Sequence, residues 1–107
     1  MKRALFICSA NKIRSPTAEQ VFSTWPDIET DSAGLDHAAT IVLSTEQIEW
    51  AGLIVGMGRS HRDRLSKEYK VQLKGKKVIC LNIPDDFVVM QPELIAVLKA
   101  RVGPHLR

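Results

Sequence analysis

The sequence has few cysteines and no long hydrophobic run. Its two cysteines, Cys8 and Cys80, are too few for the disulfide framework of a small secreted domain, and reduced thiols are typical of the cytoplasm. The apolar run at residues 4–8 is shorter than the hydrophobic part of a signal peptide. The run at residues 51–57 is far shorter than the ~20 residues that cross a bilayer. We therefore expect a soluble cytoplasmic protein with no membrane segment.

Charge of one sign is not concentrated anywhere in the chain. Fifteen Lys and Arg residues against twelve Asp and Glu give a formal net charge of +3. The densest basic group, Lys74, Lys76 and Lys77, is typical of a solvated turn before a strand, so we do not expect a nucleic-acid partner. With 45% hydrophobic and 25% charged residues, the composition predicts one globular domain over residues 1–107. It gives no indication of the oligomeric state.

Short apolar runs alternate with helical patterns along the whole chain. We predict strands at residues 3–7, 28–33, 53–57 and 78–83, and helices from Pro16 to before Pro26 with Ser15 as N-cap, at 45–50 after a Ser44–Gln47 capping box, at 60–69 and at 92–102. This βαβαβαβα order predicts a three-layer α/β/α fold with a four-stranded parallel sheet. Such sheets bind ligands at the carboxyl ends of their strands.

The loop that follows the first predicted strand, residues 8–14, carries the groups that phosphoryl transfer requires. Cys8 is a nucleophile next to a predicted helix N-terminus and a cation, two influences that favour the thiolate form of a cysteine. A loop that turns into a helix directs backbone N–H groups at an anion, and the Arg14 fork can hold two oxyanion oxygens. The Ser15 hydroxyl can donate to the sulfur. We expect phosphate or sulfate to bind here.

The order Cys8, five residues, Arg14, Ser15 and Pro16 resembles the phosphate loop of low-molecular-weight protein tyrosine phosphatases. Asn11 matches the loop asparagine of that family, and residues 16–19, 31–34 and 57–61 resemble three further segments of it. The resemblance implies hydrolysis of phosphomonoesters, with phosphotyrosine or an aryl phosphate as the expected substrate, through a phosphocysteine and without metal or cofactor. It implies substrate contacts from Ser9, Ala10, Asn11, Lys12, Ile13 and Ser15, and support of Asn11 by Ser32 and His61. The substrate would be a phosphorylated protein or a small phosphoester.

Some of these residues have a plainer interpretation or depart from the family pattern. His61 could instead be a solvent-facing helix residue, and exposed lysine is the default for Lys12. Ala10 stands where many members of the family have glycine. Ile13 stands where many have a second cysteine, so a protective disulfide within the loop is not expected.

The general acid is ambiguous between two aspartates. The family uses an aspartate followed by proline and an aromatic residue, whereas this chain has Pro84, Asp85, Asp86 and Phe87 in that order. We favour Asp85 because it follows the fourth strand at the catalytic edge, with Phe87 as a wall beside a substrate ring and Asp86 as the alternative acid. Either aspartate could instead form an Asx turn before the last helix.

Three other functions compete with a phosphatase. An arsenate reductase of the same fold would hold arsenate in the same loop. Cys80 alone cannot complete a three-cysteine relay and is expected in a buried strand, so such a reductase would need a relay of the glutathione type. A non-catalytic module that binds phosphate or phosphotyrosine gains nothing from a thiolate, which repels the ligand. A sugar-phosphotransferase subunit with a phosphocysteine loop gives no reason for Arg14. The phosphatase is the interpretation that explains most residues.

Overall fold

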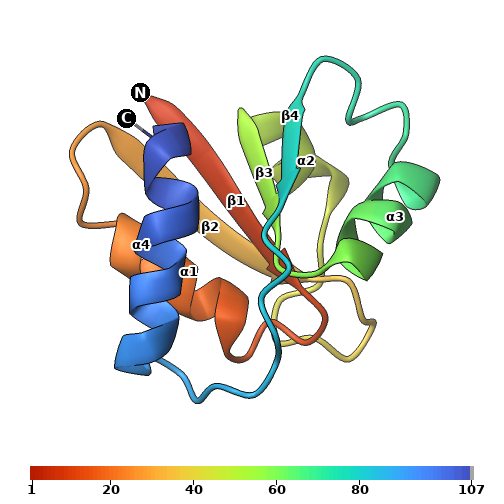
Figure 1. Ribbon diagram of the computed structural model, residues 1–107. Helices are drawn as coiled ribbons and strands as arrows, with labels where there is room; N and C mark the ends of the chain where they lie inside the picture. Colours follow the sequence, from red (N-terminus) through yellow and green to blue (C-terminus); the bar gives the residue numbers. More distant parts are fainter. Residues whose placement is uncertain (107) are drawn as a thin grey trace.

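Four strands alternate with four helices in the computed structural model, which describes residues 1–106 (Figure 1). In chain order they are β1 (Lys2–Cys8), α1 (Arg14–Phe22), β2 (Ile28–Gly34), α2 (Thr45–Trp50), β3 (Leu53–Gly56), α3 (Arg59–Glu68), β4 (Lys77–Cys80) and α4 (Pro92–Leu106). The strands form one parallel sheet in the order β2-β1-β3-β4. The predicted element order and parallel sheet are therefore confirmed.

Helices cover both faces of the sheet, which makes the three predicted layers. Helices α1 and α4 lie on one face of the sheet, and α2 and α3 lie on the other (Figure 1). Along β1, the side chains of Ala4, Phe6 and Cys8 belong to the core on the side of α1 and α4, while Leu5 and Ile7 belong to the core on the side of α2 and α3. Successive side chains of a strand point to opposite faces, so a strand covered on both faces must be apolar throughout. This explains the continuous apolar run at the start of the sequence.

The order of the strands places a ligand-binding edge at the end of β1. From β1 the chain passes through α1 to β2 on one side, and later through α2 to β3 on the other side. Loops at such a point diverge to opposite faces of the sheet, and open α/β sheets generally bind their ligands there. Residues 9–13, between β1 and α1, lie at this point.

Several element boundaries differ from the predicted ones. Helix α1 begins at Arg14 rather than Pro16, and Ser15 is a buried residue of its first turn instead of an N-cap. The predicted fourth strand ends at Cys80, although the amides of Leu81 and Ile83 still bond the carbonyls of Gly56 and Met57. Cys80 is half-buried rather than buried.

The remaining helix predictions are close to the observed boundaries. The Ser44–Gln47 capping box is confirmed at α2, and α4 extends beyond the predicted end to Leu106. Among residues 1–106, none of the helices combines the length and the apolar character that a membrane crossing requires.

Candidate active site

The loop between β1 and α1 is held by backbone hydrogen bonds to residues 35–40. The carbonyls of residues 8–10 all accept bonds from amides of that segment. No peptide bond of the described chain is cis, and in a trans peptide the N–H points opposite to the C=O of the preceding residue. The amides of residues 9–11 therefore face away from residues 35–40. The three bonds run from Leu35 to Cys8, from Asp36 to Ser9 and from Thr40 to Ala10, each at 3.0 Å.

Most backbone N–H groups of the loop have no hydrogen-bond acceptor within the described chain. Asn11 has a φ of 55°, the left-handed conformation that asparagine tolerates better than most residues, and such a residue in a turn makes successive N–H groups converge. The Asn11 amide lies 3.2 Å from the Cys8 sulfur. Within residues 1–106, the amides of Ser9, Ala10, Lys12 and Ile13 have no hydrogen-bond acceptor. Unpaired backbone donors arranged in this way are suited to an oxyanion.

Gly34 allows the end of β2 to approach this loop. A Cβ at position 34 would lie 2.6 Å from the Ser9 carbonyl oxygen and 2.5 Å from the Ala39 Cβ, distances that real Cβ atoms do not tolerate. Because one of these neighbours is backbone, a larger residue would have to displace the loop itself. The glycine is therefore a structural requirement of the loop conformation.

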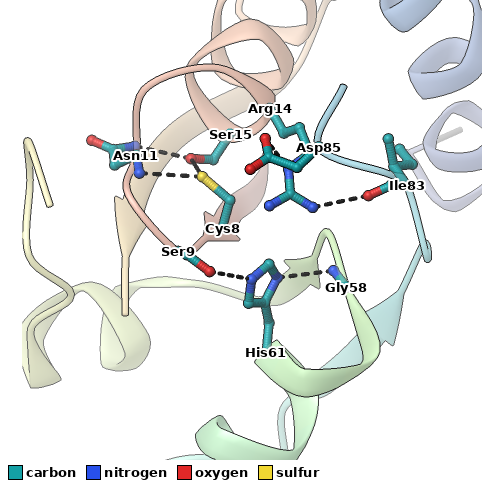
Figure 2. Close-up of polar contacts among 9 residues, drawn as sticks. All are labelled: Cys8, Ser9, Asn11, Arg14, Ser15, Gly58, His61, Ile83 and Asp85. Carbon is teal, nitrogen blue, oxygen red and sulfur yellow. Dashed lines mark hydrogen bonds and ion pairs between the residues drawn. The ribbon is translucent and has the colours of Figure 1, made fainter. Parts of the chain in front are cut away.

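Cys8 ends β1 with its side chain inside the loop and 3% of its surface exposed. Its sulfur lies 2.9 Å from the Ser15 hydroxyl oxygen in addition to the Asn11 amide (Figure 2). Hydrogen bonds to the charged form of a group favour that form. The sulfur thus has donors for a thiolate on two sides.

Arg14 is the buried cation of the site. Its Nη1 donates to the Ile83 carbonyl at 2.9 Å, and its Nε lies 3.4 Å from an Asp85 carboxylate oxygen (Figure 2). That ion pair lacks hydrogen-bond geometry, and Nε is the single buried side-chain nitrogen or oxygen in residues 1–106 without a hydrogen-bond partner. A buried donor without an acceptor is costly, and an oxyanion in the loop would supply one.

The two candidate acids lie in different surroundings. Asp85 reaches over Arg14 with 67% of its side chain exposed, so it contacts both the site and solvent. Asp86 is exposed and makes no hydrogen bond or ion pair with the described residues. Phe87 is half-buried and packs against the core between the sheet and helices α1 and α4. Of these three side chains, the structure places Asp85 beside Arg14.

Asn11 is bonded to serines from two different elements. Its Nδ2 donates to the Ser32 hydroxyl of β2 and to the Ser15 hydroxyl of α1, both at 3.0 Å. All three side chains are buried, with 0 to 3% exposure. The predicted contact between Ser32 and Asn11 is therefore present. Lys12 is exposed, and no hydrogen bond or ion pair with residues 1–106 involves its side chain.

His61 supports the loop through a different residue from the predicted one. It does not bond Asn11: its Nε2 lies 2.9 Å from the Ser9 hydroxyl, and its Nδ1 accepts the Gly58 amide at 2.9 Å (Figure 2). The ring is 3% exposed, so the solvent-facing alternative is also wrong. Burial, with the charges of Arg14 and Arg64, lowers the pKa of His61 to about 4. The ring is neutral near pH 7, and because Nδ1 accepts, Nε2 carries the proton and donates to Ser9.

The sequence interpretation missed the backbone partners of the site. Amides of residues 35–40 bond the loop, and the Ile83 carbonyl bonds Arg14. Every residue except proline has the same backbone N–H and C=O groups, so these partners could not be identified from residue types. It also missed Glu19, whose carboxylate accepts a bond from Ser32. The available signal was a glutamate that directly follows a buried position, Ala18, in the middle of α1. In the described part of the chain, no group of three or more His, Cys, Asp or Glu side chains is arranged to hold a metal ion.

Comparison with known proteins identifies the fold. No family model matches the chain, and no curated protein is significantly similar in sequence. Solved structures match over nearly the whole chain. The YwlE arginine phosphatase from Geobacillus stearothermophilus has a TM-score of 0.79 and 22% identity, with 99% of this chain and 93% of that chain covered.

Two tyrosine phosphatases are similar to the same extent. The low-molecular-weight protein tyrosine phosphatase from T. tengcongensis has a TM-score of 0.78 and 20% identity, with 97% of this chain and 99% of that chain covered. Wzb from Escherichia coli K30, solved with phosphate, has a TM-score of 0.77 and 20% identity, with 97% and 95% covered. The chain has the fold of the low-molecular-weight phosphatases, as the resemblance in sequence implied.

Proposed function

We propose that this chain is a cysteine-dependent phosphatase that hydrolyses phosphomonoesters, preferably aryl phosphates such as phosphotyrosine, through a phosphocysteine on Cys8. The observation that supports this most is the position of the Cys8 sulfur. It lies 2.9 Å from Ser15 and 3.2 Å from the Asn11 amide, inside a loop with unused N–H donors. A module that only binds phosphate gains nothing from a nucleophile held in this way.

In the first step the substrate phosphoryl group binds in the loop, with its oxygens on the free amides and on Arg14. These donors neutralise charge on the equatorial oxygens without having to reorganise. The Cys8 thiolate attacks phosphorus from the side opposite the ester oxygen. The S–P bond forms, the P–O ester bond breaks, and Asp85 gives its proton to the leaving oxygen.

In the second step water replaces the sulfur. The Asp85 carboxylate takes a proton from the water as the water oxygen bonds to phosphorus and the P–S bond breaks. The thiolate leaves, and the Ser15 hydroxyl stabilises it with a hydrogen bond. Phosphate is released with Asp85 protonated again, ready for the next cycle.

Steady-state turnover on a panel of substrates tests the proposal. The purified chain should release phosphate from nitrophenyl phosphate and phosphotyrosine faster than from alkyl phosphates. Because an arginine phosphatase has a similar fold, phosphoarginine belongs in the panel, and a preference for phosphoarginine would replace the proposed preference for aryl phosphates. Turnover of arsenate with added thiols, and none of any phosphate compound, would reject the phosphatase in favour of a reductase.

Replacing Asp85 by asparagine is expected to lower kcat about 100-fold for alkyl phosphates, the usual size of a general-acid contribution. The loss should be smaller for nitrophenyl phosphate, because nitrophenolate leaves readily without a proton. The matched variant Asp86→Asn removes the same charge one residue further along the chain. Asp86 is exposed and makes no hydrogen bond or ion pair with residues 1–106. This variant should change kcat less than threefold, by analogy with exposed substitutions. A greater loss in Asp86→Asn than in Asp85→Asn would assign the acid to Asp86.

A further inference from the structure

A continuous series of hydrogen bonds, buried except at its last member, leads from the nucleophile to the half-buried carboxylate of Glu19 on α1. It passes through Ser15, Asn11 and Ser32 and ends at Glu19, whose Oε1 accepts the Ser32 hydroxyl at 2.5 Å. Ser15, Asn11 and Ser32 are almost fully buried, so water cannot replace a missing partner. The other bonds are Cys8 Sγ to Ser15 Oγ at 2.9 Å, and Asn11 Nδ2 to Ser15 Oγ and to Ser32 Oγ at 3.0 Å each.

The carboxylate fixes the direction of every bond in this series. An ionised carboxylate only accepts, so the single hydroxyl proton of Ser32 goes to Glu19, and the Ser32 oxygen accepts from Asn11. Both N–H groups of the Asn11 amide are then used, on Ser32 and on Ser15. The Ser15 oxygen already accepts from Asn11, so its own proton is free for the Cys8 sulfur.

Glu19 has no competing partner for its charge in the described chain. The ion pairs of residues 1–106 involve other carboxylates, and no Lys, Arg or His nitrogen of these residues lies within 4 Å of a Glu19 carboxylate oxygen. Its position is fixed by α1, which packs along β2, the strand that carries Ser32. The carboxylate therefore acts on the serine hydroxyl rather than on a neutralising lysine or arginine.

We propose that Glu19 is a positioning residue that orients the Ser32, Asn11 and Ser15 hydrogen bonds so that Ser15 donates to the Cys8 thiolate. This inference rests on the proposed phosphatase mechanism, in which the thiolate must both attack and leave. Glu19 does not touch the substrate. Its effect is on the nucleophile and on the rate of phosphocysteine breakdown, whereas phosphate binding depends on the loop amides and Arg14.

The test compares Glu19→Gln, Ser32→Ala and the double variant in turnover of nitrophenyl phosphate. A glutamine is nearly isosteric but can donate as well as accept, so the fixed direction is lost. We expect kcat to fall about tenfold, the usual effect of one hydrogen bond to a charged group, with KM and inhibition by inorganic phosphate unchanged. Because Ser32 is the link, adding Glu19→Gln to Ser32→Ala should cause no further loss. The control Glu29→Gln removes an exposed carboxylate from β2 and should retain wild-type kcat.

Alkylation of Cys8 by iodoacetamide provides a second measurement that needs no phosphatase activity. Glu19→Gln should react several-fold more slowly than wild type at neutral pH and equally fast at alkaline pH, where the thiol is ionised in both. Equal alkylation at neutral pH, or additive losses in the double variant, would overturn the role of Glu19. If the wild type turned over no phosphate compound, the proposed function would fail, and the alkylation rates would still decide whether Glu19 acts on Cys8.

Discussion

Replacement of Cys8 by serine is expected to lower turnover of nitrophenyl phosphate by about 10⁴-fold or more, the scale seen when a covalent nucleophile is removed. The hydroxyl occupies nearly the same volume, and the loop bonds to residues 35–40 do not involve the side chain. Serine is far more weakly acidic than cysteine, and the site contains no base next to position 8 that could activate it. The imidazole of the site, His61, bonds Ser9 instead.

The control for this variant is Cys80→Ser, which alters the other thiol of the chain. Cys80 ends β4, is half-buried and pairs with Gly56 of β3. We expect that variant to keep kcat within a few-fold of wild type. Thermal unfolding of both variants would verify that they fold. Wild-type turnover in folded Cys8→Ser would rule out the covalent mechanism.

Arg14→Lys is expected to lower kcat/KM about 100- to 1000-fold, the loss typical of a donor that stabilises transition-state charge. Lysine keeps the charge but cannot hold two oxygens at once. It also cannot bond the Ile83 carbonyl while it reaches the phosphate, and a buried carbonyl without a donor costs about 1–3 kcal/mol of folding stability. We therefore expect both a raised KM and a reduced kcat, measured with nitrophenyl phosphate, together with a lower unfolding temperature.

The variant Lys12→Gln tests whether the Arg14 guanidinium acts through its geometry or only through its positive charge. Lys12 is the other cation of the loop, and it is exposed, where screening by solvent weakens its effect. Its loss should change kcat/KM only a few-fold at physiological salt. Equal losses in Lys12→Gln and Arg14→Lys would contradict the geometry described for Arg14.

The strands and their order could be predicted because burial on both faces demands continuous apolar sequence. The run from Ala4 to Cys8 is one example, and the alternation of such runs with helical patterns predicted the parallel sheet. Placing the cysteine loop at the carboxyl end of β1 followed directly from that topology. The fold, and the edge of the sheet at which the candidate site lies, could thus be predicted from the sequence.

The start of α1 and the partners of the loop side chains were less predictable. Ser15 has the residue type of an N-cap, but its hydroxyl is committed to Asn11 and Cys8, so the helix begins earlier without a side-chain cap. The hydrogen bonds of Ser15 within the site therefore outweighed the preference of serine for the N-cap position. His61 was assigned to Asn11 because the sequence could not show that the ring of α3 reaches Ser9 instead.

The two aspartates show the same limit of local reasoning. Asp85 and Asp86 have identical chemistry and adjacent positions, and only the path of the chain after β4 places Asp85 beside Arg14. Contacts between residues distant in sequence, such as Arg14 with Ile83, are set by packing of the whole domain. They cannot be obtained from residue types and spacing.

The central claim is that the Cys8 sulfur bonds phosphorus during turnover. The most direct test is to mix wild-type chain with excess nitrophenyl phosphate, quench within milliseconds and locate any phosphoryl group by mass spectrometry of the digested protein. The account predicts phosphate on the peptide that contains Cys8, and none on that peptide in Cys8→Ala. Phosphate on another side chain, or continued turnover with Cys8 unmodified at every quench time, would contradict it.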